Sequence, residues 1–203
     1  MPTAVLSQEL TPAEIESARL DLEQARDAVF SATEGLSEAQ WDYLPESGGW
    51  SIAANLEHMV VIQEIILGPI ADALANSAET SSYDAEAVKV LDALIRTKFP
   101  DRSRKFPSPE STHPQRRWTP SESLNRLSAN TLRLIERLES TPSLRHRSVP
   151  SPPMNAMTNG EHKSMDGYQW ILAVAAHTER HTRQILEITA EPGFPRNRAT
   201  CDT

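Results

Sequence analysis

Three histidines lie on apolar, helix-like segments of the chain, where imidazole rings can bind a metal ion. His177 and His181 are four residues apart, and His58 lies within a separate apolar stretch. Residues four apart stack on one face of a helix, so these two imidazoles can converge on one ion at about 2.0–2.1 Å. Polar rings on a buried face need a shared partner. The three rings together predict one divalent metal ion with positions left open to water or substrate.

The same spacing has a simpler interpretation, in which each ring is a hydrogen-bonded histidine of the protein core, and this alternative stays open. A zincin peptidase is not indicated. Glu179 follows His177 by two residues, about 200° round the helix, so it points away from the ion and cannot act as that family's general base. The remaining histidines, His113, His146 and His162, fall in connections and are expected to be solvated.

Capping signals and apolar spacing predict the four long helices that must position these rings. Thr11 and Thr119 are each followed by Pro and then by Glu three residues on, which is typical of a capping box at a helix start. Ser51 can cap a helix that Gly68-Pro69 stops or kinks. The predicted long helices span about 12–33, 52–67, 120–138 and, from a cap at Ser164 or Asp166, to about 189. In the last helix one stripe carries Trp170, Val174, His177, His181 and Ile188.

Shorter helices and long connections complete the expected fold. Segments 37–43 and 84–96 have short helical patterns, while prolines punctuate 98–118 and 143–164, which we interpret as long connections, and 191–203 forms a tail. No segment alternates with period two, so little or no sheet is expected. The sequence predicts an all-α protein: a four-helix bundle of the up-down-down-up type with crossover connections and short extra helices. It forms one domain over 1–203 with its core over about 11–190.

Composition limits the classes of function. The net charge is −8, with 38% hydrophobic and 24% charged residues, which disfavours nucleic-acid binding because phosphate contacts require a basic surface. The single cysteine, Cys201, excludes an intrachain disulfide and lies in the tail, where a bystander role is expected. The first residues lack the pattern of a secretion signal, and no apolar run approaches the ~20 residues that span a bilayer. We therefore expect a cytoplasmic protein without membrane contact.

Two motifs, in their order and spacing, are similar to those of a known family. Trp50-Ser51 followed by Asn55-Leu-Glu-His58, and later His177-x3-His181-x2-Gln184-Ile185, resembles the DinB/YfiT-like superfamily from the first helix to about Thr189. The resemblance implies a four-helix bundle that holds a divalent metal, often nickel or zinc. It also implies that the three metal ligands correspond to His58, His177 and His181.

The resemblance implies several functions. Relatives include S-transferases and isomerases that use a low-molecular-weight thiol, bacillithiol or mycothiol, and proteins assigned as metal-dependent hydrolases. We expect a small-molecule substrate and a homodimer, with a low-molecular-weight thiol as cosubstrate if the protein is a transferase. Trp50 and Trp170 are candidates for pocket walls or for core packing. Two alternatives to an enzyme remain: a binding module whose metal is closed by Glu57 or Gln184, and a metal-free helical interaction protein.

Overall fold

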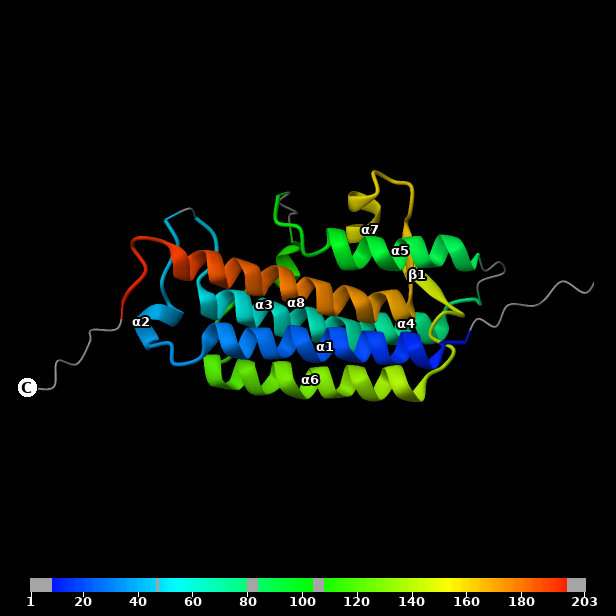
Figure 1. Ribbon diagram of the computed structural model, residues 1–203, viewed down its shortest axis with the longest axis horizontal. Coiled ribbons are helices and arrows are strands. Elements are labelled where there is room, and N and C mark those ends of the chain that lie inside the picture. Colours follow the sequence, from blue (N-terminus) through cyan, green and yellow to red (C-terminus); the bar gives the residue numbers. More distant parts are fainter. Residues whose placement is uncertain (1–8, 47, 80–83, 104–107, 197–203) are drawn as a thin grey trace, which may run out of the picture.

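Four long helices form an elongated bundle in the computed structural model, which describes residues 9–46, 48–79, 84–103 and 108–196 (Figure 1). These helices are α1 (Pro12–Thr33), α3 (Ile52–Ile65), α6 (Pro120–Ser140) and α8 (Gly167–Ala190). Helices α1 and α3 each pack against both α6 and α8. Along the long axis α1 and α8 run in one direction and α3 and α6 in the other (Figure 1). The all-α, up-down-down-up bundle predicted from the sequence is confirmed.

The long helices begin where the sequence places its capping residues. Thr11 and Thr119 each form a complete capping box with the Glu three residues later, and each is followed by Pro. Asp166, one of the two predicted caps of the last helix, forms such a box with Gln169. Side-chain oxygens at these positions accept hydrogen bonds from backbone N–H groups that lack a partner within the helix, which sets the start of each helix.

Of the two outcomes expected at Gly68-Pro69, a stop or a kink, the stop is wrong. The backbone stays helical through a π-helical turn, η1 (Ile66–Ile70), and continues as α4 (Ala71–Asn76). A π-turn shifts the hydrogen-bond pattern by one residue and so absorbs the missing N–H of Pro69 without ending the helix.

The expectation that no apolar run approaches the length needed to span a bilayer is wrong for this continuous helix. Ile52–Asn76 spans 25 residues and contains an 18-residue window with a mean hydropathy of 1.4, so by length and composition alone it could cross a membrane. In the structure α3 instead packs along α6 and α8 as one wall of the bundle. Packing against α6 and α8 covers part of this apolar surface, and 39% of the apolar window is buried.

Helix α5 (Ala85–Lys98) lies outside the bundle along α8 (Figure 1). A buried ion cluster attaches it there. The Arg145 guanidinium contacts the carboxylates of Asp92 on α5, Asp166 at the start of α8 and Glu14 on α1, at 2.6, 3.1 and 2.7 Å. The Arg145 side chain is only 1% exposed.

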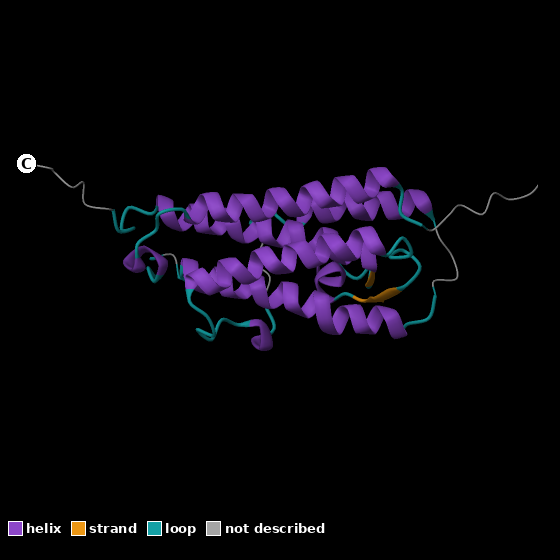
Figure 2. Cartoon of the chain, turned by 90° about the horizontal axis from the view of Figure 1, so that it is seen from below, coloured by secondary structure: helices purple, strands orange, loops and turns teal. Residues whose placement is uncertain are grey.

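Short elements occupy the predicted connections. Segment 98–118 contains a 3-10 turn, η2 (Glu110–Thr112), and the loop after α1 contains α2 (Glu38–Trp41). Segment 143–164 contains α7 (Pro152–Met157) and the strand β1 (Ser148–Pro150), which pairs antiparallel with β2 (Ser164–Asp166). Figure 2 shows this two-stranded ribbon beside the helices. The expectation of little sheet is confirmed, and Cys201 lies outside the described residues.

Candidate metal centre

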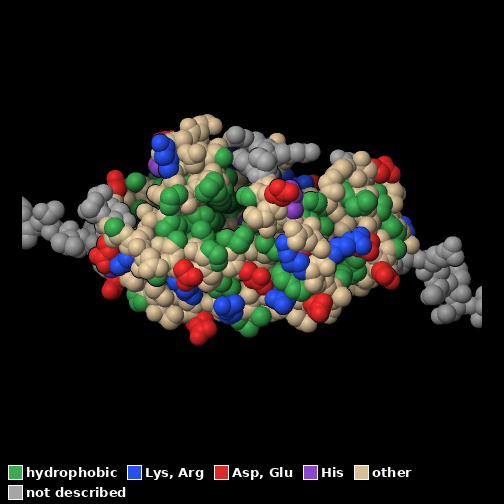
Figure 3. Space-filling model, turned by 180° about the vertical axis from the view of Figure 1, so that it is seen from behind, with side chains coloured by type: hydrophobic (Ala, Val, Ile, Leu, Met, Phe, Trp, Pro, Cys, Tyr) green, Lys and Arg blue, Asp and Glu red, His purple; other side chains and the backbone are tan. Residues whose placement is uncertain are grey.

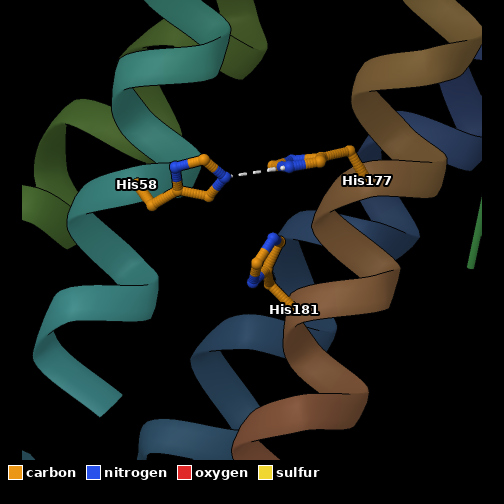
Figure 4. A group of neighbouring side chains, drawn as sticks. All are labelled: His58, His177 and His181. Atoms are coloured by element: carbon orange, nitrogen blue, oxygen red, sulfur yellow. Dashed lines mark hydrogen bonds between the residues drawn. The ribbon is translucent and has the colours of Figure 1, made fainter. Parts of the chain in front are cut away.

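The three predicted histidines meet in the space between α3 and α8 (Figure 4). Nε2 of His58 lies 3.2 Å from Nε2 of His177. The ring centroids of His177 and His181 are 4.5 Å apart, and those of His58 and His181 are 4.9 Å apart. One nitrogen from each ring lies within 4.8 Å of the others, an arrangement that could hold a metal ion. Two antiparallel helices thus bring together residues more than a hundred positions apart in the sequence.

The separation of the nitrogens suits a shared ion. Two nitrogens bound to one tetrahedral ion at about 2.0–2.1 Å stand about 3.3 Å from each other. The Nε2 atoms of His58 and His177, at 3.2 Å, already have this spacing. The donor set is three neutral nitrogen ligands, which zinc, nickel and cobalt accept.

Hydrogen bonds at the far side of two rings leave a lone pair on Nε2, which in His58 faces Nε2 of His177. Nδ1 of His58 lies 2.8 Å from the backbone oxygen of Thr112, and Nδ1 of His181 lies 2.9 Å from Oδ1 of Asn55. Both oxygens only accept hydrogen bonds, so both Nδ1 atoms carry the proton and both Nε2 atoms keep a lone pair. Metal-binding histidines commonly have such a partner on the second nitrogen, which fixes ring orientation and tautomer.

The amide of Asn55 is itself held in place. Its Nδ2 donates to the backbone oxygens of Trp50 and Ser51, at 3.2 and 2.9 Å. With the amide nitrogen bound to the start of α3, the amide oxygen is directed at His181. Asn55 is fully buried, so water does not compete for that oxygen.

All three imidazoles are kept neutral. Burial lowers the pKa of His58 below its ordinary value, against the opposing effect of the hydrogen bond to Thr112. Burial, together with the neighbouring His58 and Arg180, lowers the pKa of His177 to about 3. Burial and the other two histidines hold the pKa of His181 well below its usual range. Only a neutral imidazole can bind a metal ion, so the site is in its ligand form at neutral pH.

The site is enclosed on most sides but reaches the surface at one ligand. His58 and His181 are 3% and 7% exposed, whereas His177 is half-buried. The ring of Trp50 covers the cluster, with its centroid 4.7 Å from that of His58 and 6.3 Å from that of His181. Trp50 is therefore a wall of the site, one of its two predicted roles. Trp170 instead lies 8% exposed in the hydrophobic core.

Neither candidate for a closing ligand is directed at the histidines. Both carboxylate oxygens of Glu57 are bonded to Gln115 and Arg117. Oε1 of Gln184 accepts a hydrogen bond from Arg102, at 3.0 Å. In the part of the chain that the structure describes, the cluster that could hold an ion consists of the three histidines alone.

Glu179 points away from the site, as its position two residues after His177 predicts. It lines a cavity of about 330 Å³ on another face of α8, formed with α1 and α5. The expectation for the remaining histidines holds only in part: His113 is exposed, but His146 and His162 are partly buried because the short elements of segment 143–164 cover them.

Asn55 and the Thr112 carbonyl are functional groups that the sequence did not reveal. Asn55 belongs to the quoted motif and shares a helix face with His58, but its partner is His181 on another helix. Thr112 acts through its backbone, which every residue possesses. No pattern of residue types could have identified it.

Comparison with known proteins assigns the family. Neither a curated protein nor a solved structure matches the chain. The family model of the DinB superfamily matches residues 21–185, which include all three histidines and the helices that carry them. This match covers most of the chain and agrees with the bundle and its histidine cluster. The chain is therefore a member of the DinB superfamily.

Proposed function

We propose that this protein is a metal-dependent enzyme that holds one divalent ion, nickel or zinc, on His58, His177 and His181. The observation that carries the proposal is the convergence of three neutral imidazoles, two of which have Nδ1 hydrogen-bonded to an oxygen and a lone pair on Nε2. Structural zinc sites usually have four protein ligands, whereas three ligands leave a position for a reactant.

A bound ion at this site would supply Lewis acidity, which lowers the pKa of a bound thiol or water toward neutrality. The chain's own residues prepare the site for a reactant. Trp50 excludes water from one side of the rings, while the partly exposed His177 marks the open side. The reaction is then an S-transfer from a low-molecular-weight thiol or a hydrolysis.

A small organic molecule is the substrate class that we propose, in the cytoplasm. Figure 3 shows a hollow lined by hydrophobic side chains on the face opposite that of Figure 1. Concave, mostly apolar surfaces are where proteins bind small molecules. The net charge of −8 argues against a nucleic-acid substrate.

Cobalt substitution tests whether the site is open. Cobalt(II)-loaded protein is titrated with azide and with a small thiol while the visible absorption is followed, with His177→Ala as the matched control. We expect the bands to shift in the wild type only. A conjugate formed from a thiol and 1-chloro-2,4-dinitrobenzene supports the transferase, and cleavage of an activated ester supports the hydrolase. A spectrum that ignores every small ligand would indicate a closed site and a non-catalytic metal-binding protein.

A further inference from the structure

Glu57 attaches the segment between α5 and α6 to helix α3. Its Oε1 accepts hydrogen bonds from the backbone N–H of Gln115, at 2.8 Å, and from Nη1 of Arg117, at 2.6 Å. Its Oε2 lies 3.3 Å from the backbone nitrogen of Arg117. The side chain of Glu57 is 4% exposed and that of Arg117 is 28% exposed. One buried carboxylate thus contacts two backbone N–H groups and a guanidinium.

The turn that contacts His58 lies directly before these anchor points. In η2 the hydroxyl and the backbone N–H of Thr112 both donate to the backbone oxygen of Pro109, at 2.7 and 2.9 Å. The Thr112 side chain is buried. These bonds hold the turn rigid and leave the carbonyl of Thr112 directed at Nδ1 of His58, 2.8 Å away.

The Glu57 contacts and the His58–Thr112 contact lie close together on both α3 and the crossing segment. Glu57 and His58 are consecutive on α3, and Thr112 and Gln115 are three residues apart on the crossing segment. A movement of η2 away from His58 would therefore pull on the bond between Gln115 and Glu57, three residues further along the segment.

We propose that Glu57 is a positioning residue of the metal site, an inference that rests on the proposed function. By fixing the crossing segment, Glu57 keeps the Thr112 carbonyl against His58 Nδ1, which keeps the proton on Nδ1 and the lone pair on Nε2. Without this acceptor, His58 is free to rotate and to move its proton to Nε2, which cannot then bind an ion.

Fold stability alone is a weak explanation for this carboxylate. A buried ion pair loses about as much free energy by desolvation as it regains by attraction. Glu64, about two turns further along α3, forms a pair with Arg126 at 3.1 Å, but both side chains are substantially exposed and neither contacts a histidine. Glu64 therefore provides a matched control on the same helix.

The test compares Glu57→Gln with Glu64→Gln, using zinc as the probe. Zinc affinity is measured by competition with a chromophoric chelator, and helix content by circular dichroism. Nitrogen-15 NMR of the apo protein reports which ring nitrogen of His58 carries the proton. We expect Glu57→Gln to weaken zinc binding by about tenfold or more and to shift the His58 proton toward Nε2. Glu64→Gln should stay within about twofold of the wild type in affinity.

The outcomes of this comparison separate failure of the inference about Glu57 from failure of the proposed function. Zinc affinity in Glu57→Gln within twofold of the wild type, or an equal loss in Glu64→Gln, would overturn the inference while leaving the three-histidine site intact. Wild-type protein that binds no zinc would overturn the proposed function as well. If Glu57→Gln does not fold, Arg117→Gln is measured instead. This substitution breaks the same ion pair at its more exposed partner. A several-fold loss of affinity is then expected, and no loss overturns the inference.

Discussion

Oδ1 of Asn55 on α3 lies 2.9 Å from Nδ1 of His181 on α8, so α3 sets the tautomer of a histidine on α8. This contact links the two helices at the point where the imidazoles converge. It makes the proposed metal site dependent on a residue that is not one of the three histidines.

Asn55→Ala should therefore weaken zinc binding by about 10–100-fold, the usual effect of losing the partner behind a metal-bound histidine. A chelator competition assay measures it. Ser51→Ala is the control, because it removes the cap of α3 without touching a histidine and should lower stability by about 1 kcal/mol with affinity unchanged. Equal affinities in Asn55→Ala and the wild type would show that the amide does not position His181.

Metal removal should destabilise the fold. An ion that binds only the folded state adds RT ln(1 + [M]/Kd), about 2.7 kcal/mol at a hundred times Kd, which corresponds to roughly 5–10 °C in Tm for a chain of this size. Differential scanning fluorimetry with and without chelator measures the shift. His177→Ala should melt at the same temperature in both conditions, and a chelator effect of equal size in that variant would contradict ligation by His177.

The apo protein should lose stability as the pH falls below about 6.5. Burial lowers the pKa of His177 to about 3 and also lowers that of His58 and His181, so between these values the unfolded chain binds more protons than the folded one. The free energy of unfolding then rises with pH, by at most about 1.4 kcal/mol per pH unit for each proton taken up. Urea unfolding at pH 5 and pH 7 tests this. A pH dependence unchanged by His177→Ala would count against a buried neutral imidazole there.

The Arg145 cluster should control stability without affecting the metal. Arg145→Met leaves the carboxylates of Asp92, Asp166 and Glu14 without their shared cation and should cost about 3–5 kcal/mol in the free energy of unfolding. The control Arg19→Met breaks partly exposed pairs on α1 that water screens, and should cost far less. Chemical denaturation distinguishes them, and losses of similar size would mean that burial of the cluster is unimportant.

The sequence was informative where local chemistry decides the structure. Capping residues such as Thr11 and Thr119 mark helix starts, and the spacing of His177 and His181 places both on one helix face. His58 could be assigned to the same site because it lies on the second apolar helix. Its distance to His177, however, is set only by how the helices pack.

What the sequence missed depends on contacts between distant segments. The π-turn at Pro69 exists because packing keeps the helix going past a local stop signal. The roles of Asn55 and of the Thr112 carbonyl follow from neighbours 126 and 54 positions away. Glu57 has the residue type of a metal ligand, and only the structure shows that it is turned toward Arg117.

The most direct test of the three-histidine site is elemental analysis of the purified protein and of His177→Ala and His181→Ala. The wild type should contain close to one divalent ion per chain, nickel or zinc. Each variant should lose that ion while circular dichroism shows unchanged helix content, because the three rings lie together in the structure. Full metal occupancy in either variant, or a wild type that takes up no divalent ion, would contradict the site.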